Sequence, residues 1–141
     1  MRGIYLLIID SNYPIEVEVG ALGEIGFHEG RYIYVGSAQN GVEKRVERHL
    51  RDDKRKHWHI DHLLEEAQVK EVMGYGEKKK EECRTAAILK EKFSLVEGFG
   101  CSDCRCDSHL FYSEEDVDSL IEKIRDLKGR EDLLLKDVKT Q

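Results

Sequence analysis

Apolar and polar positions in the first part of the chain follow the spacing of β-strands. Residues 3–10 are almost continuously apolar, as a buried strand is, and residues 15–19 alternate apolar with acidic side chains. Residues 11–14 have the composition of a turn, so we expect these two strands to form a hairpin. Four glycines within residues 20–30 predict a loop, which leads to a third strand at 31–36.

The middle of the chain has the spacing of amphipathic helices. Val42, Val46 and Leu50 recur every four residues and predict a helix over residues 41–51 with one side facing a core. The other elements that the pattern predicts are, in order, a helix at 58–67, a strand at 69–75, a helix at 79–92 and a short strand at 109–112.

The last part of the chain predicts one more helix. Ser113 is followed by three acidic residues, which suits an N-cap and a first helical turn, and Gly129 ends the helix. We expect residues 129–141 to be a frayed helix or a partly ordered arm. The pattern as a whole predicts an α/β (α+β) fold, in which helices flank a small, mainly antiparallel sheet. Its parts are a domain at 1–112, a helix packed on it at 113–128, and the tail.

Charge is distributed unevenly along the 141 residues. The formal net charge is −6, which opposes broad adhesion to nucleic acid because a polyanion is repelled at long range. Residues 44–56 nevertheless contain seven basic and three acidic side chains. This basic segment is either a local nucleic-acid contact, with Lys44, Arg48 and Arg51 as candidate ligands, or an ordinary solvated helix face.

Targeting signals and cysteine usage indicate the cellular compartment. The longest apolar run is far shorter than the roughly 20 residues of a membrane helix, and no signal-peptide cleavage site follows the first residues. We therefore expect a cytoplasmic protein with no membrane partner. Four cysteines in such a chain favour reduced thiols or a metal site over disulfides.

Two tripeptides and the helix after them carry the residue types that phosphodiester hydrolysis needs. Gly3-Ile4-Tyr5 and Tyr34-Val35-Gly36 precede the helix that carries Arg45 and His49. If the first and third strands pair, both phenols can reach one water or phosphate, and Gly36 leaves room for close approach. Arg45 can bind phosphate through two hydrogen bonds, and His49 can donate a proton or contact phosphate. The alternative is that both tyrosines are only sheet aromatics.

This ordered series resembles the GIY-YIG nuclease superfamily. Residues 58–61, Glu82-Cys83 and residues 98–112 further resemble an uncharacterised, mainly archaeal and bacterial branch, a domain of unknown function sometimes fused to endonuclease III. The resemblance implies metal-dependent cleavage of DNA, in repair or at branched structures, with Glu82 holding one Mg²⁺ or Mn²⁺ ion. The well-studied nucleases end their catalytic module with an asparagine, whereas this chain has none after Asn40. A catalytically weak module that binds nucleic acid and recruits repair enzymes is therefore the alternative.

Two further clusters contain metal-ligating residue types. Cys101, Cys104, Cys106 and His109 offer four zinc ligands, but structural zinc sites generally draw their ligands from separated segments. We therefore favour a hydrogen-bonded lid, held by Asp103, Ser108 and His109, over a zinc site.

The other cluster, residues 57–62, contains three histidines. His59 could bind zinc with His62 or Asp61, and either His57 or His59 could contact nucleic acid near the phosphate. We expect Trp58 to belong to the core rather than to a surface that stacks bases.

Overall fold

A computed structural model describes residues 1–101, 104–129 and 133–135 of the chain. The strands are β1 (Gly3–Ser11), β2 (Ile15–Glu18), β3 (Glu24–Phe27), β4 (Gly30–Ala38), β5 (Gln68–Tyr75), β6 (Ser94–Leu95), β7 (Leu110–Ser113) and β8 (Leu133–Leu135). The helices are α1 (Val42–Leu50), α2 (His59–Leu63), α3 (Lys80–Lys92) and α4 (Val117–Lys128), with a 3-10 turn, η1, at Gly20–Leu22. In the described part of the chain, no helix is long and apolar enough to cross a bilayer.

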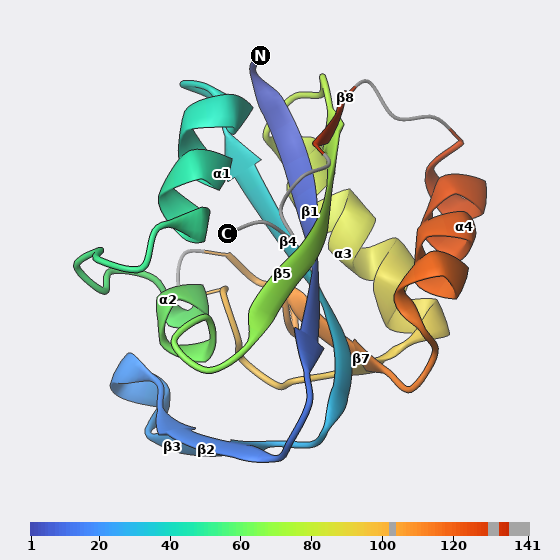
Figure 1. Ribbon diagram of the computed structural model, residues 1–141. Coiled ribbons are helices and arrows are strands. Elements are labelled where there is room, and N and C mark those ends of the chain that lie inside the picture. Colours follow the sequence, from blue (N-terminus) through green and yellow to red (C-terminus); the bar gives the residue numbers. More distant parts are fainter. Residues whose placement is uncertain (102–103, 130–132, 136–141) are drawn as a thin grey trace.

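The main sheet has six strands in the order β6-β7-β4-β1-β5-β8, and all its pairings are antiparallel. β1 lies inside this sheet between the long strands β4 and β5 (Figure 1). The predicted mixed α+β fold with a mainly antiparallel sheet is confirmed. The predicted pairing of the first and third predicted strands, now β1 and β4, is also confirmed.

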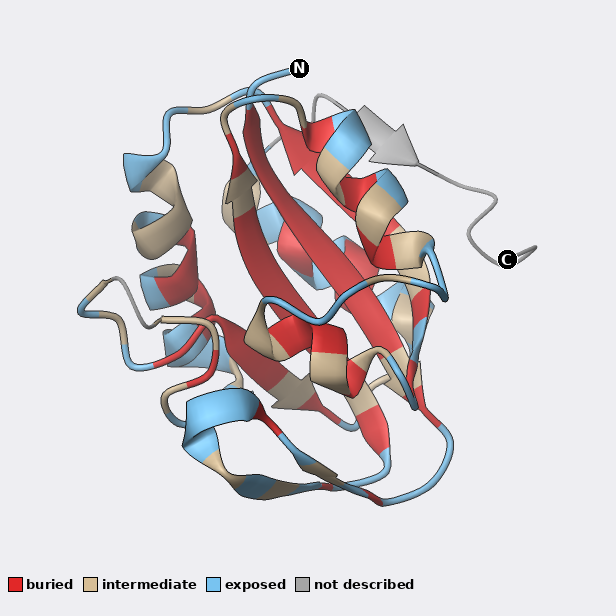
Figure 2. Cartoon of the chain, turned by 90° about the vertical axis from the view of Figure 1, so that its left-hand side faces the viewer, coloured by how far each residue is buried: buried red, intermediate tan, exposed pale blue. Residues whose placement is uncertain are grey.

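Helices cover both faces of the main sheet, so the protein has three layers (Figure 1). Alternate residues of β1 divide between two apolar clusters, because successive side chains of a strand point to opposite faces. Tyr5 and Leu7 join the cluster on the side of α1 and α2, whereas Ile4 and Leu6 join the cluster on the side of α3 and α4. Figure 2 shows the central strands of the main sheet largely buried, whereas exposed residues lie on the helices, in the loops and on the β2–β3 pair.

The predicted hairpin of the first two strands is wrong. β2 pairs with β3 in a separate two-stranded sheet, and β1 pairs only with β4 and β5 among the described strands. β1 is buried along nearly its whole length and needs neighbours that are apolar on both faces. Glu16 and Glu18 of β2 are exposed and do not meet that need. The glycine-rich segment after β2, predicted as a loop, supplies η1 and β3 instead.

Several element boundaries also differ from prediction. α2 ends at Leu63 rather than at residue 67, and the turn that follows leads directly into β5. Asp116 caps α4 by accepting a hydrogen bond from the Ser119 amide at 2.8 Å, whereas Ser113 accepts one from Glu115 within a turn. Residues 133–135 of the predicted tail form β8 beside β5. Residues 130–132 and 136–141 lie outside the described part, so the prediction of a frayed helix or partly ordered arm is not tested there.

Candidate active site

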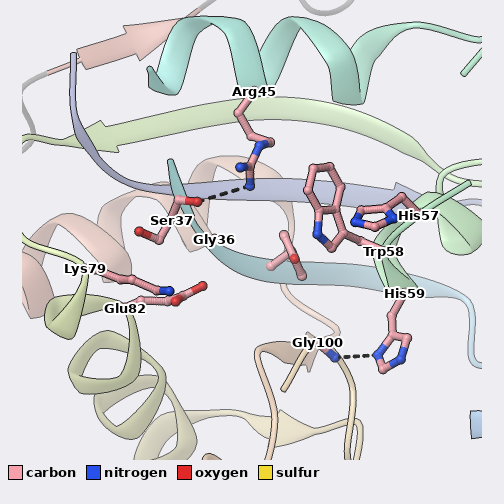
Figure 3. A pocket seen from close by; sticks show the side chains of 10 residues that line it. Gly36, Ser37, Arg45, His57, Trp58, His59, Lys79, Glu82 and Gly100 are labelled. Carbon is pink, nitrogen blue, oxygen red and sulfur yellow. Dashed lines mark hydrogen bonds between the residues drawn. The ribbon is translucent and has the colours of Figure 1, made fainter. Parts of the chain in front are cut away.

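A pocket of about 440 Å³ opens beside the end of β4. The side chains on its walls come from β4, α1, the segment before α2, the start of α3 and the loop at Gly100 (Figure 3). The lining residues are Tyr34, Gly36, Ser37, Arg45, His57, Trp58, His59, Lys79, Glu82 and Gly100. The pocket therefore joins segments that are far apart in the sequence, and three of the predicted catalytic residues line it: Tyr34, Arg45 and Glu82.

Gly36, which lines the pocket, faces Tyr5 across the β1–β4 pair. They are register partners, and the Tyr5 ring lies across the glycine so closely that an added Cβ would sit 2.4 Å from the phenol oxygen. Only glycine leaves this space open. Tyr34 lies on the same face, with its ring centroid 6.4 Å from that of Tyr5. The predicted proximity of the two phenols is thus present.

Tyr5 is hydrogen-bonded to His49, a buried residue of α1. The phenol oxygen lies 2.7 Å from His49 Nε2. Burial lowers the pKa of His49 to about 3, and burial raises the pKa of Tyr5 although the charge of Arg45 opposes that rise. Both groups are therefore uncharged at neutral pH, and their contact joins a neutral phenol to a neutral imidazole. Burial likewise raises the pKa of Tyr34, so this phenol is also protonated.

Arg45 is held at the upper wall of the pocket by two contacts. Its Nη1 donates to the Ser37 carbonyl oxygen at 3.1 Å, and its Cζ lies 4.4 Å from the centroid of a Trp58 ring (Figure 3). A guanidinium has five N–H donors, so the hydrogen bond to Ser37 leaves capacity for a ligand. Trp58 lines the pocket while its other contacts reach the core cluster. Trp58 thus packs against the core, as predicted, and also forms part of the pocket wall.

Arg48 holds the segment before α2 against α1. Its Nη1 and Nη2 donate to the two carboxylate oxygens of Asp61 at 2.9 and 3.0 Å, and Nη2 also donates to the Arg55 carbonyl at 2.8 Å. Asp61 accepts the amides of His57 and Trp58 as well, at 2.7 and 2.9 Å. Burial raises the pKa of Asp61, but the hydrogen bonds from Arg48 and the two amides outweigh it and lower the pKa to about 2.

Of the three basic residues predicted to bind nucleic acid, none lines the pocket. The Arg48 side chain is directed at Asp61, Lys44 is exposed on α1, and Arg51 is exposed just beyond the end of that helix. Lys44 and Arg51 therefore lie on the exposed surface of α1 and just beyond its end, outside the pocket. Arg48 has a positioning role in this structure that the sequence did not indicate.

His57 and His59 both line the pocket, on the side of α2. The Gly100 amide donates to His59 Nδ1 at 2.8 Å, which leaves the ring proton of the neutral imidazole on Nε2 (Figure 3). Burial lowers the pKa of His59, which favours this neutral form. Asp61 is not available as a zinc ligand beside His59, because its oxygens accept hydrogen bonds from Arg48 and backbone amides.

Glu82 and Lys79 form the wall opposite Arg45, at the start of α3 (Figure 3). The carboxylate of Glu82 is the acidic group among the lining residues, so it is the one that could hold a divalent cation there. Its Oε2 also lies 3.5 Å from Nδ1 of His109, which is buried behind the pocket. Lys79 was not predicted as a site residue, because a lone lysine before a helix has no distinguishing sequence signal.

Three cysteines and a histidine gather behind Glu82. The ligand atoms of Cys83, Cys104, Cys106 and His109 all lie within 4.8 Å of one another and could hold a metal ion. This group corrects the predicted zinc set, because α3 brings Cys83 to the loop whereas Cys101 stays outside. The signal that could have found it is the fourth cysteine, in Glu82-Cys83, which lies on a separate segment as zinc sites require.

Part of the predicted lid is present in the same loop. The Ser108 hydroxyl donates to the Leu110 carbonyl and accepts the Leu110 amide, both at 2.9 Å. Asp103 lies outside the described residues. The loop is therefore hydrogen-bonded as expected at Ser108, while His109 belongs to the cysteine group as well.

Comparisons with known proteins place the chain in a family without extending to a function. None of the curated proteins and none of the solved structures matches it. A family model does match, and it spans β1 to the end of α4, so it includes every residue of the pocket. The chain belongs to the family described as Domain of unknown function DUF123, whose model matches residues 4–130.

Proposed function

We propose that this protein hydrolyses phosphodiester bonds of DNA in a metal-dependent reaction, as an endonuclease of the GIY-YIG type. One observation carries the proposal. Tyr34, Arg45 and Glu82 come from three separate elements and line a single pocket, with the Tyr5–His49 pair directly behind Gly36. A phenol, a guanidinium and a carboxylate are the groups needed to orient water, hold phosphate and bind a cation.

Arg45 and Lys79 are the phosphate-binding groups of this proposal. They stand on opposite walls, so a phosphodiester between them meets positive charge from both sides (Figure 3). The arginine is fixed by Ser37 and Trp58 before any ligand arrives, which reduces the entropy lost on binding. Arg45 thus offers a bidentate contact in place, and Lys79 adds a point charge.

Glu82 would hold the divalent cation. Mg²⁺ is commonly bound by one or two carboxylates with water and substrate phosphate oxygens completing its shell, and the single carboxylate of this pocket fits that pattern. When bound, Mg²⁺ or Mn²⁺ would supply positive charge to the phosphate oxygens.

The Tyr5–His49 pair would take the proton of the attacking water. Water gives a proton to the Tyr5 oxygen while Tyr5 passes its own proton to His49 Nε2, 2.7 Å away. The water oxygen then bonds to phosphorus, the bond to the leaving oxygen breaks, and that oxygen gains a proton from solvent. His49 afterwards returns its proton to solvent, which restores the neutral pair. Tyr34 positions the water from the pocket wall. Both phenols start protonated, which such a relay requires.

The second candidate is a module that binds nucleic acid and recruits a repair enzyme without cutting. The observation that favours it is the low basicity of His49: burial lowers its pKa to about 3, so the imidazole is a poor acceptor for the proton of Tyr5. Such a pocket could hold a phosphate without activating water. The absence of an asparagine after Asn40 agrees with this alternative.

A cleavage assay separates the two. Supercoiled plasmid, flapped and forked DNAs and structured RNA are incubated with the protein and Mg²⁺ or Mn²⁺. We expect cutting of DNA that Arg45→Ala lowers by at least about 10²-fold, the usual cost of losing one transition-state donor. Arg84→Ala is the matched control, because Arg84 is exposed on α3, outside the pocket, and forms a surface ion pair with Glu81. Unchanged cutting by Arg45→Ala would refute the assignment.

The same set of proteins identifies the binding module. Glu82→Gln should abolish metal-dependent cutting but retain binding of a fluorescent DNA, since the phosphate contacts remain. If the wild type cuts none of the substrates yet Arg45→Ala weakens its DNA binding, the second candidate holds.

A further inference from the structure

We propose that Cys83, Cys104, Cys106 and His109 form a structural zinc centre, and that this centre positions Glu82 in the pocket through the imidazole of His109. The zinc centre itself does not depend on the proposed nuclease function. Its consequence for activity does, because it concerns the orientation of the carboxylate that would hold the catalytic cation.

The ligand set fits zinc in type and number. Three thiolates and one imidazole are a common structural zinc set, and zinc prefers four ligands in a tetrahedron. Zinc–sulfur bonds of about 2.3 Å place tetrahedral ligand atoms about 3.8 Å apart. Cys104 Sγ lies 3.7 Å from His109 Nε2, and all four ligand atoms lie within 4.8 Å of one another. Small side-chain rotations would therefore close the group around one ion.

The ligands come from two segments that are separate in sequence, as in most structural zinc sites. Cys83 lies on α3, and the other three lie in the loop before β7. The cysteines are free thiols, so no disulfide competes for them. The four candidates in residues 101–109 were too close together in sequence to surround one ion, and the helix cysteine removes that difficulty.

Asp107 and His109 are held in place by contacts other than metal ligation. The His109 amide donates to the Phe99 carbonyl at 2.8 Å, and its carbonyl accepts the Val35 amide of β4 at 2.9 Å. Lys90 of α3 forms an ion pair with Asp107 of the loop. These contacts place residues 107–109 beside β4 and the helix that carries Cys83, so the position of the ligand His109 does not depend on a bound metal.

His109 connects the cysteine group to the pocket. Its Nε2 faces Cys104, and its Nδ1 lies 3.5 Å from Glu82 Oε2. With Nε2 bound to zinc, the proton of the neutral ring stays on Nδ1 and points at the carboxylate. Histidine ligands of zinc commonly donate their other ring N–H to a carboxylate in this way, which fixes the ring and its partner. The zinc-bound His109 therefore orients Glu82 in the pocket wall, and Glu82 in turn holds the His109 ring toward the metal.

Metal analysis of the purified protein tests the centre without reference to activity. We expect one zinc per chain, and loss of zinc in Cys83→Ser and in Cys104→Ser. Cys101→Ser is the matched control, because it lies in the same loop but outside the group, and it should keep its zinc. Wild type that takes up no zinc on dialysis refutes the centre. So does a result in which Cys101→Ser loses zinc and Cys83→Ser keeps it.

A cobalt spectrum and a chelator competition test the geometry and the link to Glu82. Cobalt added to metal-free protein should give the strong visible absorption of a tetrahedral site and the thiolate charge-transfer bands of three sulfurs, both weakened in Cys83→Ser. Glu82→Ala should weaken zinc affinity by about 10–100-fold, the usual effect of removing such a partner. Glu81→Ala, one residue earlier, should leave it unchanged. Equal zinc affinity in both variants would refute the link. A wild type that binds zinc but cuts nothing would refute only the nuclease.

Discussion

At Gly36, one missing methyl group lets the phenol of Tyr5 lie across the strand. An added Cβ would lie 2.4 Å from both the Cζ and the hydroxyl oxygen of that ring, and Tyr5 is only 1% exposed, so the ring cannot move away cheaply. We predict that Gly36→Ala lowers the free energy of unfolding by about 1–3 kcal/mol, the usual cost of overpacking a core. Urea denaturation measures it.

Gly26→Ala is the control for that experiment. Gly26 also lies in a strand, but its added Cβ would meet only the Glu16 side chain at 3.9 Å, an ordinary contact. This variant should be close to wild type. If Gly36→Ala were equally stable, the Tyr5 ring would have to lie elsewhere, and its contact with His49 would be in doubt.

His49 predicts a pH dependence of stability. Burial lowers the pKa of folded His49 to about 3, below the ordinary 6.5, so the unfolded chain binds more protons between those values. The contribution is fully present above pH 6.5 and is lost as the pH falls toward 3, at up to about 1.4 kcal/mol per pH unit. His59 acts in the same direction because burial lowers its pKa too.

Urea denaturation between pH 6.5 and 5 isolates this histidine effect, because Asp61 acts only at lower pH. We expect His49→Gln to remove most of the slope in this range. His28→Gln, at an exposed histidine, should keep it. An unchanged slope in His49→Gln would mean that the imidazole is not buried in its neutral form.

Arg48 and Asp61 show how one ion pair fixes the junction of α1 and α2. The Asp61 side chain is 0% exposed and accepts two hydrogen bonds from Arg48 and two from backbone amides. Removing one partner of a buried pair leaves the other charge buried and unpaired, which commonly costs about 3–5 kcal/mol. We predict a loss near that range for Arg48→Ala in urea denaturation at pH 7, and almost none for the exposed Arg51→Ala.

The acid range tests the same pair. Hydrogen bonds lower the pKa of Asp61 to about 2 against burial, from an ordinary 3.8, so its contribution is present above pH 3.8 and is lost as the pH falls through 2. The difference between wild type and Arg48→Ala should therefore shrink in that window. Arg48 Cζ also lies 4.3 Å from the centroid of a Trp58 ring. A difference that stays constant down to pH 2 would show that the arginine acts through this contact alone.

The elements that the sequence predicted well are those whose spacing is set locally. α1 follows from Val42, Val46 and Leu50, and β1 follows from its continuous apolar run, because burial on both faces demands such residues. Strand partners depend on contacts between distant segments. No local sequence signal indicates that β2 pairs with β3 rather than with β1. The short β6 and the early end of α2 depend on the same kind of tertiary contact.

The site residues likewise divide into those that the sequence predicted and those that depend on tertiary contacts. Tyr34 and Arg45 could be predicted because they stand in an ordered series, and Glu82 because the family resemblance implies an acidic residue there. Neither prediction needs knowledge of how the loops fold. Lys79 and the exchange of Cys101 for Cys83 depend on where α3 meets the loop before β7. Arg48 looked like a phosphate ligand because its partner, Asp61, is thirteen residues away and lies in a different helix.

For the molecule as a whole, the net charge of −6 opposes DNA while the pocket and the basic segment 44–56 favour it. Only the basic residues close to the bound phosphates release counterions on binding, so the salt dependence should report a small local contact. We predict that fluorescence anisotropy with duplex DNA gives a slope of log K against log salt of about −3 to −5, which corresponds to a few phosphates.

Single charge removals locate that contact on the surface. Lys44 is exposed on α1, and Arg51 is exposed just beyond its end. Lys44→Gln and Arg51→Gln should therefore each reduce the slope by about 1, the effect of one phosphate. Lys92 is also exposed, but it lies at the far end of α3 from Glu82, so Lys92→Gln should leave the slope unchanged. Equal reductions by all three variants would mean that DNA responds only to the total charge of the protein, and the basic segment would then have no special part in binding.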